Sequence, residues 1–244
     1  MSATLQALWR DKLDVVFPRT CVHCGGLAED DRLRHLCPAC AKLLFIVQAP
    51  HCTTCGQPYF GETELNRLCP HCEALEPKFA AGKTAVLLKG AGRSLVHALK
   101  YHRALHILPD LAAVMALVPG YADYLRGAVL VPVPLHPRKL RERSYNQSRL
   151  LAECAVLACA GEARIEELLQ RDVDTESQTR YARAARQKNL KNAFALAPGA
   201  AINSGQRYVL VDDVFTTGST LNSCSAVLRR AGVLSLDVVT FGHG

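Results

Sequence analysis

Hydrophobic positions beyond residue 80 fall into short apolar runs separated by longer helical stretches. The run at 208–211 is continuous rather than alternating, which is typical of a strand buried on both faces of a parallel sheet. Helices are predicted between the runs, at about 93–117, 145–160 and 221–231. The strand-like runs are TAVLLK (84–89), AVLVPVP (128–134), YVLVDD (208–213) and LSLDVVTF (234–241). This alternation predicts an α/β fold with a parallel sheet and crossover helices.

The first residues follow a helical period. Apolar side chains recur at helical spacing, with charged residues between them, up to Pro18: Leu5, Leu8, Trp9, Leu13, Val16 and Phe17. This pattern predicts an amphipathic N-terminal helix over residues 1–18, which is neither a signal peptide nor a membrane span. Because no export signal is recognised, we expect a cytoplasmic protein without a membrane span.

Between these parts lie eight of the eleven cysteines, arranged as four C-x-x-C pairs. Two such knuckles can close one tetrahedral zinc site with four thiolate ligands. Sequential pairing predicts one site from Cys21, Cys24, Cys37 and Cys40 and a second from Cys52, Cys55, Cys69 and Cys72, and cross-braced pairing stays open. His23 and His71 lie inside knuckles and are weaker candidate ligands. Disulfides are disfavoured in a cytoplasmic chain.

We expect both zinc ions to be structural. A segment of about 60 residues with few large apolar side chains cannot be stabilised by burial alone, and each structural zinc contributes on the order of 10 kcal/mol or more. The net charge of +7 is uneven, with 8 basic and 9 acidic residues up to residue 80 and 21 and 13 after it. An anion-binding role is therefore predicted for the second part.

The stretch VLVDDVFTTGST (209–220) combines acceptors and donors at the end of a predicted strand. Asp212 and Asp213 could accept hydrogen bonds from sugar hydroxyls, and the loop Thr216, Thr217, Gly218, Ser219 and Thr220 runs into a predicted helix. The free N–H groups of a helix N-terminus bind phosphate, and Gly218 permits close approach. The stretch therefore predicts a site for a ribose 5-phosphate.

Two other interpretations of this stretch are weaker. A helix-capping turn explains the hydroxyls but not the paired acids. A Walker B strand requires a phosphate loop upstream, and the nearest candidate, PKFAAGKT (77–84), has Pro77 where the first glycine belongs.

Two basic stretches surround the predicted site. RKLRERSYNQSR (138–149) follows the second predicted strand and suggests another anion-binding loop. QTRYARAARQKNLKNAF (178–194) has no acidic residue, and it suggests either a basic flap over an anionic substrate or a solvated helix face.

These motifs together resemble a known family. VLVDDVFTTGST is similar to the phosphoribosyl pyrophosphate loop of type I phosphoribosyltransferases, and cysteine knuckles joined to such a domain resemble the ComF/GntX family, whose members look like factors for DNA uptake and use. LVPVPLHPRKLRERSYNQSRLLA (130–152) resembles another family region, although Ser144-Tyr145 stands where Gly-Phe is usual. Lys100 also matches a family position. The resemblance implies a double zinc ribbon over 19–78 and a Rossmann-like phosphoribosyltransferase domain over 79–244.

The resemblance also implies roles for individual residues. Asp212 and Asp213 would hold the ribose hydroxyls, residues 216–220 would bind the 5-phosphate, and Mg²⁺ would accompany the pyrophosphate. Candidates for the pyrophosphate or the flap are Arg141, Arg143, Asn146, Gln147, Arg186 and Lys191. No general base or acceptor substrate is apparent.

Three functions of different classes follow from these motifs. The chain could be a phosphoribosyltransferase enzyme; it could bind phosphoribosyl pyrophosphate, a nucleotide or single-stranded DNA without turnover; or its ribbons could be adaptors for a DNA-uptake partner. A single-strand binder needs aromatic stacking platforms, for which Tyr101, Tyr145 and Tyr181 are candidates.

Overall fold

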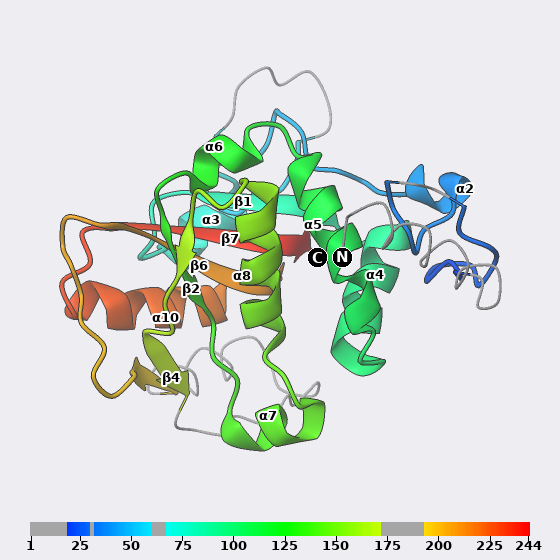
Figure 1. The fold of residues 1–244 in the computed structure, drawn as a ribbon. Helices are drawn as coiled ribbons and strands as arrows, with labels where there is room; N and C mark the ends of the chain where they lie inside the picture. Colours follow the sequence, from blue (N-terminus) through cyan, green and yellow to red (C-terminus); the bar gives the residue numbers. More distant parts are fainter. Residues whose placement is uncertain (1–18, 30–31, 60–66, 172–192) are drawn as a thin grey trace.

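A computed structural model describes residues 19–29, 32–59, 67–171 and 193–244 of the chain (Figure 1). The predicted N-terminal helix over 1–18 lies outside the described residues. So does most of the second basic stretch, including the flap candidates Arg186 and Lys191 and the aromatic candidate Tyr181.

A five-stranded sheet forms the centre of the α/β part, and all of its strand pairs are parallel (Figure 1). Its order is β1-β7-β6-β2-β3, with bounds β1 Gly82–Leu87, β7 Ser235–His243, β6 Arg207–Phe215, β2 Val129–Pro132 and β3 Arg164–Ile165. The four predicted strands and the α/β class are confirmed. The sequence missed β3 because two residues leave no periodic pattern. A separate antiparallel pair joins β4 (Leu169–Arg171) to β5 (Phe194–Leu196).

Side chains of β6 alternate between two cores, one on each face of the sheet. Val209 and Val211 belong to the core that contains α4 (Gly90–Tyr101), α5 (Leu108–Ala116), α6 (Tyr121–Leu125) and α8 (Gln147–Ala158). Tyr208 and Leu210 belong to the core that contains α10 (Ser219–Arg230). All four β6 side chains are buried, which explains why the run is continuously apolar.

The single long helix predicted at 93–117 is wrong. Helix α4 ends at Tyr101, and after a 3-10 turn (η1, Leu105–Ile107) α5 begins at Leu108. Arg103 has a left-handed backbone with φ of 50°, which an α-helix cannot continue through. Pro109 lies in the first turn of α5, where its missing N–H costs nothing.

The first basic stretch forms a helix rather than the predicted anion-binding loop. Helix α7 (Pro137–Arg143) begins after His136, whose Nδ1 accepts the Arg138 N–H at 3.3 Å, and it ends at Ser144. Ser144 has φ of 70°, so it occupies the left-handed conformation that a glycine would adopt more readily.

The cysteine-rich part contains two short helices, α2 (Pro38–Ala41) and α3 (Pro70–Leu75). The chain between them runs antiparallel to β1: the Val47 N–H bonds the Ala85 carbonyl, and the Leu87 N–H bonds the Phe45 carbonyl, each at 2.9 Å. This segment therefore covers the outer side of the edge strand β1. Among the helices of the described ranges, none is both long and apolar enough to cross a membrane.

Candidate functional site

The eight knuckle cysteines form two clusters of four: Cys21, Cys24, Cys37 and Cys40, and Cys52, Cys55, Cys69 and Cys72. Within each cluster all Sγ atoms lie within 4.8 Å of one another. The Sγ atoms are 3.8 Å apart both for Cys24 and Cys37 and for Cys55 and Cys69. Sulfurs at the corners of a tetrahedron about 2.3 Å from zinc are separated by about 3.8 Å. Both clusters therefore fit a structural zinc ion, and the pairing is sequential.

The alternatives to sites made of four thiolates do not fit this geometry. All eight thiols are free, and the sulfur separations are far from the roughly 2.05 Å of a disulfide. Among the described residues, neither His23 nor His71 belongs to a cluster, which agrees with the sequence prediction that cysteines alone are the ligands. Backbone N–H groups instead support the second site, where Cys69 N–H donates to Cys52 Sγ and Gln57 N–H donates to Cys55 Sγ, each at 3.4 Å.

The paired acids, Asp212 and Asp213, lie near the C-terminal end of β6, beside the N-terminus of α8. Asp212 Oδ1 accepts the Ser148 hydroxyl at 3.0 Å and the Asp213 N–H at 2.9 Å. Lys100 Nζ, from the end of α4, lies 3.0 Å from Asp213 Oδ1. The other oxygen, Asp213 Oδ2, is buried and has no hydrogen-bond partner within the part of the chain that the structure describes. An acceptor prepared in this way fits a ligand hydroxyl or a metal-bound water.

One carboxyl group of the acid pair, that of Asp212, has a raised pKa. Burial of its carboxyl group and, next, the neighbouring Asp213 charge raise the pKa of Asp212 to about 7. The Asp213 N–H, Lys100 and the Ser148 hydroxyl act in the opposite direction. Strongly shifted carboxyl groups of this kind occur more often at binding sites than elsewhere.

The predicted loop at 216–220 is shorter than the sequence suggested, because helix α10 already begins at Ser219, while β6 ends at Phe215, which pairs with His243 of β7. Gly218 stands at the N-cap of α10 with φ of 69°, and helix α10 begins at Ser219. The Thr217 hydroxyl donates to Ser219 Oγ at 3.0 Å and accepts the Ser219 N–H at 3.4 Å. The loop thus presents hydroxyls and backbone N–H groups at the start of a twelve-residue helix, which is an arrangement suited to an anion.

Of the two predicted residues at the start of α8, Asn146 connects this site to the residue that follows β2. Asn146 caps α8 by accepting the Ser148 N–H at 3.1 Å, and its Nδ2 donates to the Val133 carbonyl at 3.0 Å. Gln147 is buried at the first position of α8. The structure therefore brings the start of α8 to the end of β6, as the parallel-sheet topology requires.

The predicted arginines are placed differently. Arg141 is exposed on α7, and the Arg143 guanidinium lies 5.9 Å from the centre of the Tyr101 ring. Neither has a described contact with the acid pair. Their role toward pyrophosphate, like that of Arg186 and Lys191, stays a prediction.

Three contacts at the site escaped sequence reasoning. The ion pair of Lys100 with Asp213 and the hydrogen bond of Ser148 to Asp212 form only in the folded chain, and no local sequence pattern marks either residue for this role. His71 Nε2 donates to the Thr217 carbonyl at 3.2 Å from the second zinc cluster, 146 residues away in sequence. The phosphate-loop alternative fails, since Gly82, Lys83 and Thr84 form the start of β1.

Comparison with known proteins finds a family model for the cysteine-rich part and relatives that match most of the chain. Residues 12–73 match the family model described as a double zinc ribbon domain. Competence protein F of Haemophilus influenzae is 30% identical over 225 residues, which is 89% of this chain and 94% of that protein. This chain belongs to the ComF family. The DNA utilization protein YhgH of Escherichia coli is 31% identical over 77% of this ComF-family chain and 81% of its own length.

A more distant relative and two solved structures are also similar to it. Competence protein ComFC of Bacillus subtilis is 24% identical over 81% of this chain and 79% of its own length. A hypoxanthine phosphoribosyltransferase from Staphylococcus aureus aligns over 56% of this chain and 62% of its own, with 17% identity and a TM-score of 0.35. A purine phosphoribosyltransferase from Pyrococcus horikoshii aligns over 56% and 82%, with 10% identity and a TM-score of 0.33. The assignment of the family rests on the relatives, and that of the α/β class on the sheet itself.

Proposed function

We propose that this protein binds phosphoribosyl pyrophosphate together with Mg²⁺ at the end of β6, and that it acts as a phosphoribosyltransferase-like protein in the uptake or use of DNA. One observation carries the proposal. The unpartnered, buried Oδ2 of Asp213 lies in the same strand-to-helix segment as the Gly218 turn that opens α10. A sugar phosphate needs an acceptor for its hydroxyls and N–H donors for its phosphate, and this short segment offers both.

In this proposal, neutral hydroxyl and N–H donors bind the phosphate of the ligand, and carboxylates bind its ribose hydroxyls. The hydroxyls and N–H groups of residues 216–220 bind the 5-phosphate, and Asp212 and Asp213 bind the ribose hydroxyls. Lys100 offsets the charge of Asp213, so that the acid pair repels an anionic ligand less. Carboxylate oxygens are the ligands that Mg²⁺ prefers, and the ion supplies charge neutralisation to the pyrophosphate when bound.

The same residues would favour transfer of the phosphoribosyl group. Departure of pyrophosphate from C1 leaves positive charge on the ribose ring, and a carboxylate close to the ring stabilises that charge. The enzyme class inferred is a pentosyltransferase. The names of the relatives, competence protein and DNA utilization protein, support a connection with DNA.

A second candidate, binding of single-stranded DNA without turnover, is supported by one exposed surface. The Tyr101 side chain is 64% exposed, with the Arg143 guanidinium over its ring and the His97 ring 4.8 Å away. The Arg103 guanidinium lies nearby and donates to the Glu142 carbonyl of α7 at 2.8 Å. An exposed ring beside cations can stack a base and attract its phosphate. A role of the ribbons as adaptors stays a prediction.

The test is calorimetric titration of the zinc-loaded protein with phosphoribosyl pyrophosphate and Mg²⁺. We expect saturable binding that is lost in the Asp212→Asn, Asp213→Asn double variant and kept in Asp123→Asn, a matched change at a carboxylate that is 73% exposed. Circular dichroism and zinc content would show that the variants fold. Absence of binding by the folded wild-type protein would reject the proposal in favour of the DNA-binding candidate.

A further inference from the structure

The second zinc ribbon packs directly against the anion loop. His71, between two zinc ligands, donates from Nε2 to the Thr217 carbonyl at 3.2 Å. Leu75 of α3 lies so close to Gly218 that a Cβ added there would be 2.7 Å from Leu75 Cδ2. The Asn222 side chain, one turn into α10, donates to the Leu75 carbonyl at 3.3 Å. These contacts join two residues of the ribbon, His71 and Leu75, to Thr217, Gly218 and Asn222 at the loop and the start of α10.

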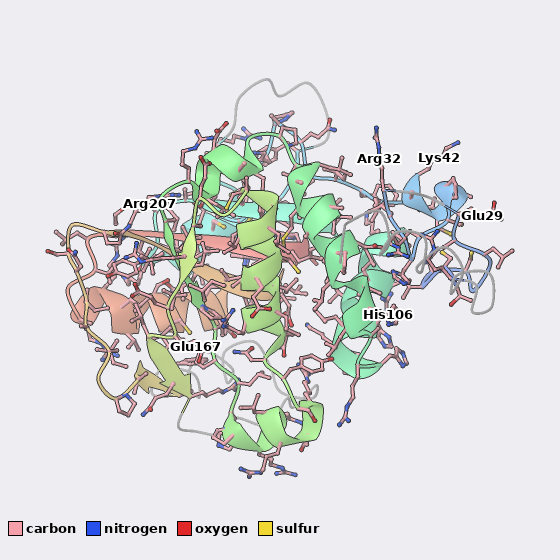
Figure 2. All side chains as sticks on the ribbon, viewed as in Figure 1. Glu29, Arg32, Lys42, His106, Glu167 and Arg207 are labelled. Atoms are coloured by element: carbon pink, nitrogen blue, oxygen red, sulfur yellow. The ribbon has the colours of Figure 1, made fainter. Side chains whose placement is uncertain are left out.

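The first ribbon packs elsewhere. His23 Nδ1 lies 2.8 Å from the Ser94 hydroxyl on α4. The N–H groups of Arg34 and His35 donate to the two oxygens of the buried Asp110 on α5, at 3.0 and 2.7 Å. Figure 2 shows this ribbon, with Glu29, Arg32 and Lys42, on the opposite margin of the molecule from Arg207 at the start of β6. Only the second ribbon is thus seen to contact the loop within the described ranges.

The contact from His71 has a direct consequence for the loop backbone. A trans peptide is planar, with its C=O and N–H pointing in opposite directions. A hydrogen bond that holds the Thr217 oxygen toward the ribbon therefore turns the Gly218 N–H away from the ribbon. Gly218 is the N-cap residue of α10, so no hydrogen bond within the helix fixes the peptide between Thr217 and Gly218. The hydrogen bond from the His71 imidazole to the Thr217 carbonyl therefore sets the orientation of this peptide.

We propose that His71 is a positioning residue of the anion loop, and that the second zinc ribbon forms a wall of this loop, so that anion affinity depends on the second ribbon and not on the first. The role of the loop in binding a phosphate rests on the function proposed above. The zinc site contributes by fixing the backbone on both sides of His71, since Cys69 and Cys72 are its ligands.

The chain contains a matched control for this proposal. His23 and His71 occupy the same place in two C-x-H-C knuckles, and each reaches from its ribbon to the α/β part. We would compare His71→Ala, His71→Gln and His23→Ala. The Gln amide nitrogen can replace Nε2 as a donor. Titration with phosphoribosyl pyrophosphate and Mg²⁺ should show affinity about tenfold weaker for His71→Ala, partly restored in His71→Gln and unchanged in His23→Ala, with zinc content the same in all three.

A second measurement does not depend on the ligand. Hydrogen exchange of peptides covering residues 215–222 in the ligand-free protein should accelerate in His71→Ala and stay at the wild-type rate in His23→Ala. Equal exchange in both variants, or wild-type affinity in His71→Ala, would overturn the role of His71. If the wild-type protein binds no ligand but the loop still loosens in His71→Ala, the proposed function fails and the positioning role stands.

Discussion

The ammonium group of Lys100 lies 3.0 Å from a carboxylate oxygen of Asp213, joining the end of α4 to the end of β6. Both side chains are mostly enclosed, with 20% and 9% of their surface exposed. Water therefore screens this pair much less than it screens the ion pairs on α7. The pair ties the end of a helix to the acid site and leaves one Asp213 oxygen available.

The first prediction concerns this ion pair. Lys100→Met should lower the free energy of unfolding by roughly 2–4 kcal/mol, because it leaves a buried carboxylate without its cation. Adding Asp213→Asn should recover most of the loss. Urea unfolding at pH 7.5 measures both. Lys139→Met breaks the exposed pair with Glu142 and serves as the control, for which we expect little change. Equal effects of the two lysine substitutions would contradict the argument.

The second prediction separates backbone strain from steric contact at the loop. Gly218 and Gly127 both have φ of 69°, but a Cβ on Gly218 would meet Phe215 Cζ at 2.6 Å, whereas one on Gly127 has nothing within 4 Å. Gly127→Ala should therefore lower the free energy of unfolding by only about 1 kcal/mol, which is the cost of placing alanine in a left-handed backbone conformation. Gly218→Ala should cost more and should weaken ligand binding at least tenfold. Thermal unfolding and calorimetric titration test the pair, and equal losses would show that the contact with Phe215 relaxes easily.

A third prediction follows from the raised pKa of Asp212. In the unfolded chain this carboxyl ionises near its ordinary value of 3.8, but in the folded protein it ionises near pH 7. Between these values the unfolded state loses its proton first, so the native state loses stability as pH rises, and above about pH 7 the loss is constant. Asp212→Asn should remove this cost.

The measurement is urea unfolding of wild type and Asp212→Asn between pH 5.5 and 8. As pH rises across this range, the free energy of unfolding of the variant should increase relative to that of wild type by roughly 1–3 kcal/mol. Asp123→Asn, at an exposed carboxylate, should show a flat difference. A flat difference for Asp212→Asn as well would mean that its carboxyl ionises normally.

The two zinc sites should also differ in their rate of metal release. In the first cluster Cys24 is exposed, whereas all four thiols of the second cluster are buried. A chelator should therefore remove the first zinc faster, giving two phases of equal amplitude when release is followed with a chromophoric indicator. Cys24→Ala should lack the fast phase and bind one zinc per chain. Loss of the slow phase instead would reverse the assignment.

The DNA-binding candidate makes its own prediction. Tyr101→Ala should weaken binding of a poly-dT oligonucleotide by roughly 1–3 kcal/mol, whereas Tyr101→Phe, which keeps the ring, should bind normally. Fluorescence anisotropy at two salt concentrations would separate stacking from charge, because only the electrostatic part falls steeply with salt. A loss in Tyr101→Phe equal to that in Tyr101→Ala would exclude stacking.

Local patterns predicted what depends on neighbours in sequence. The four main strands, the two clusters of four cysteines and the strand-turn-helix segment that contains Asp212 and Gly218 all have their determinants within a few residues or in repeated spacings. The break after α4 was missed although Pro109, which lies in the first turn of α5, is a sequence signal for a new helix. The sequence gives no sign that Arg103 is left-handed, so the end of α4 itself was not marked. The contacts of Lys100 with Asp213 and of His71 with Thr217 could not be predicted for another reason, since these residues come together only when the sheet is assembled.

The chain segment at 45–47 that runs along β1 has a consequence for how the molecule can be divided. Without it, β1 would present a row of free backbone groups on an apolar strand, which is a template for aggregation between copies. A fragment that begins at residue 79 would carry this open edge. The α/β part is therefore expected to need the ribbon-bearing segment for solubility, and trimming the chain at that point is a poor route to a crystallisable core.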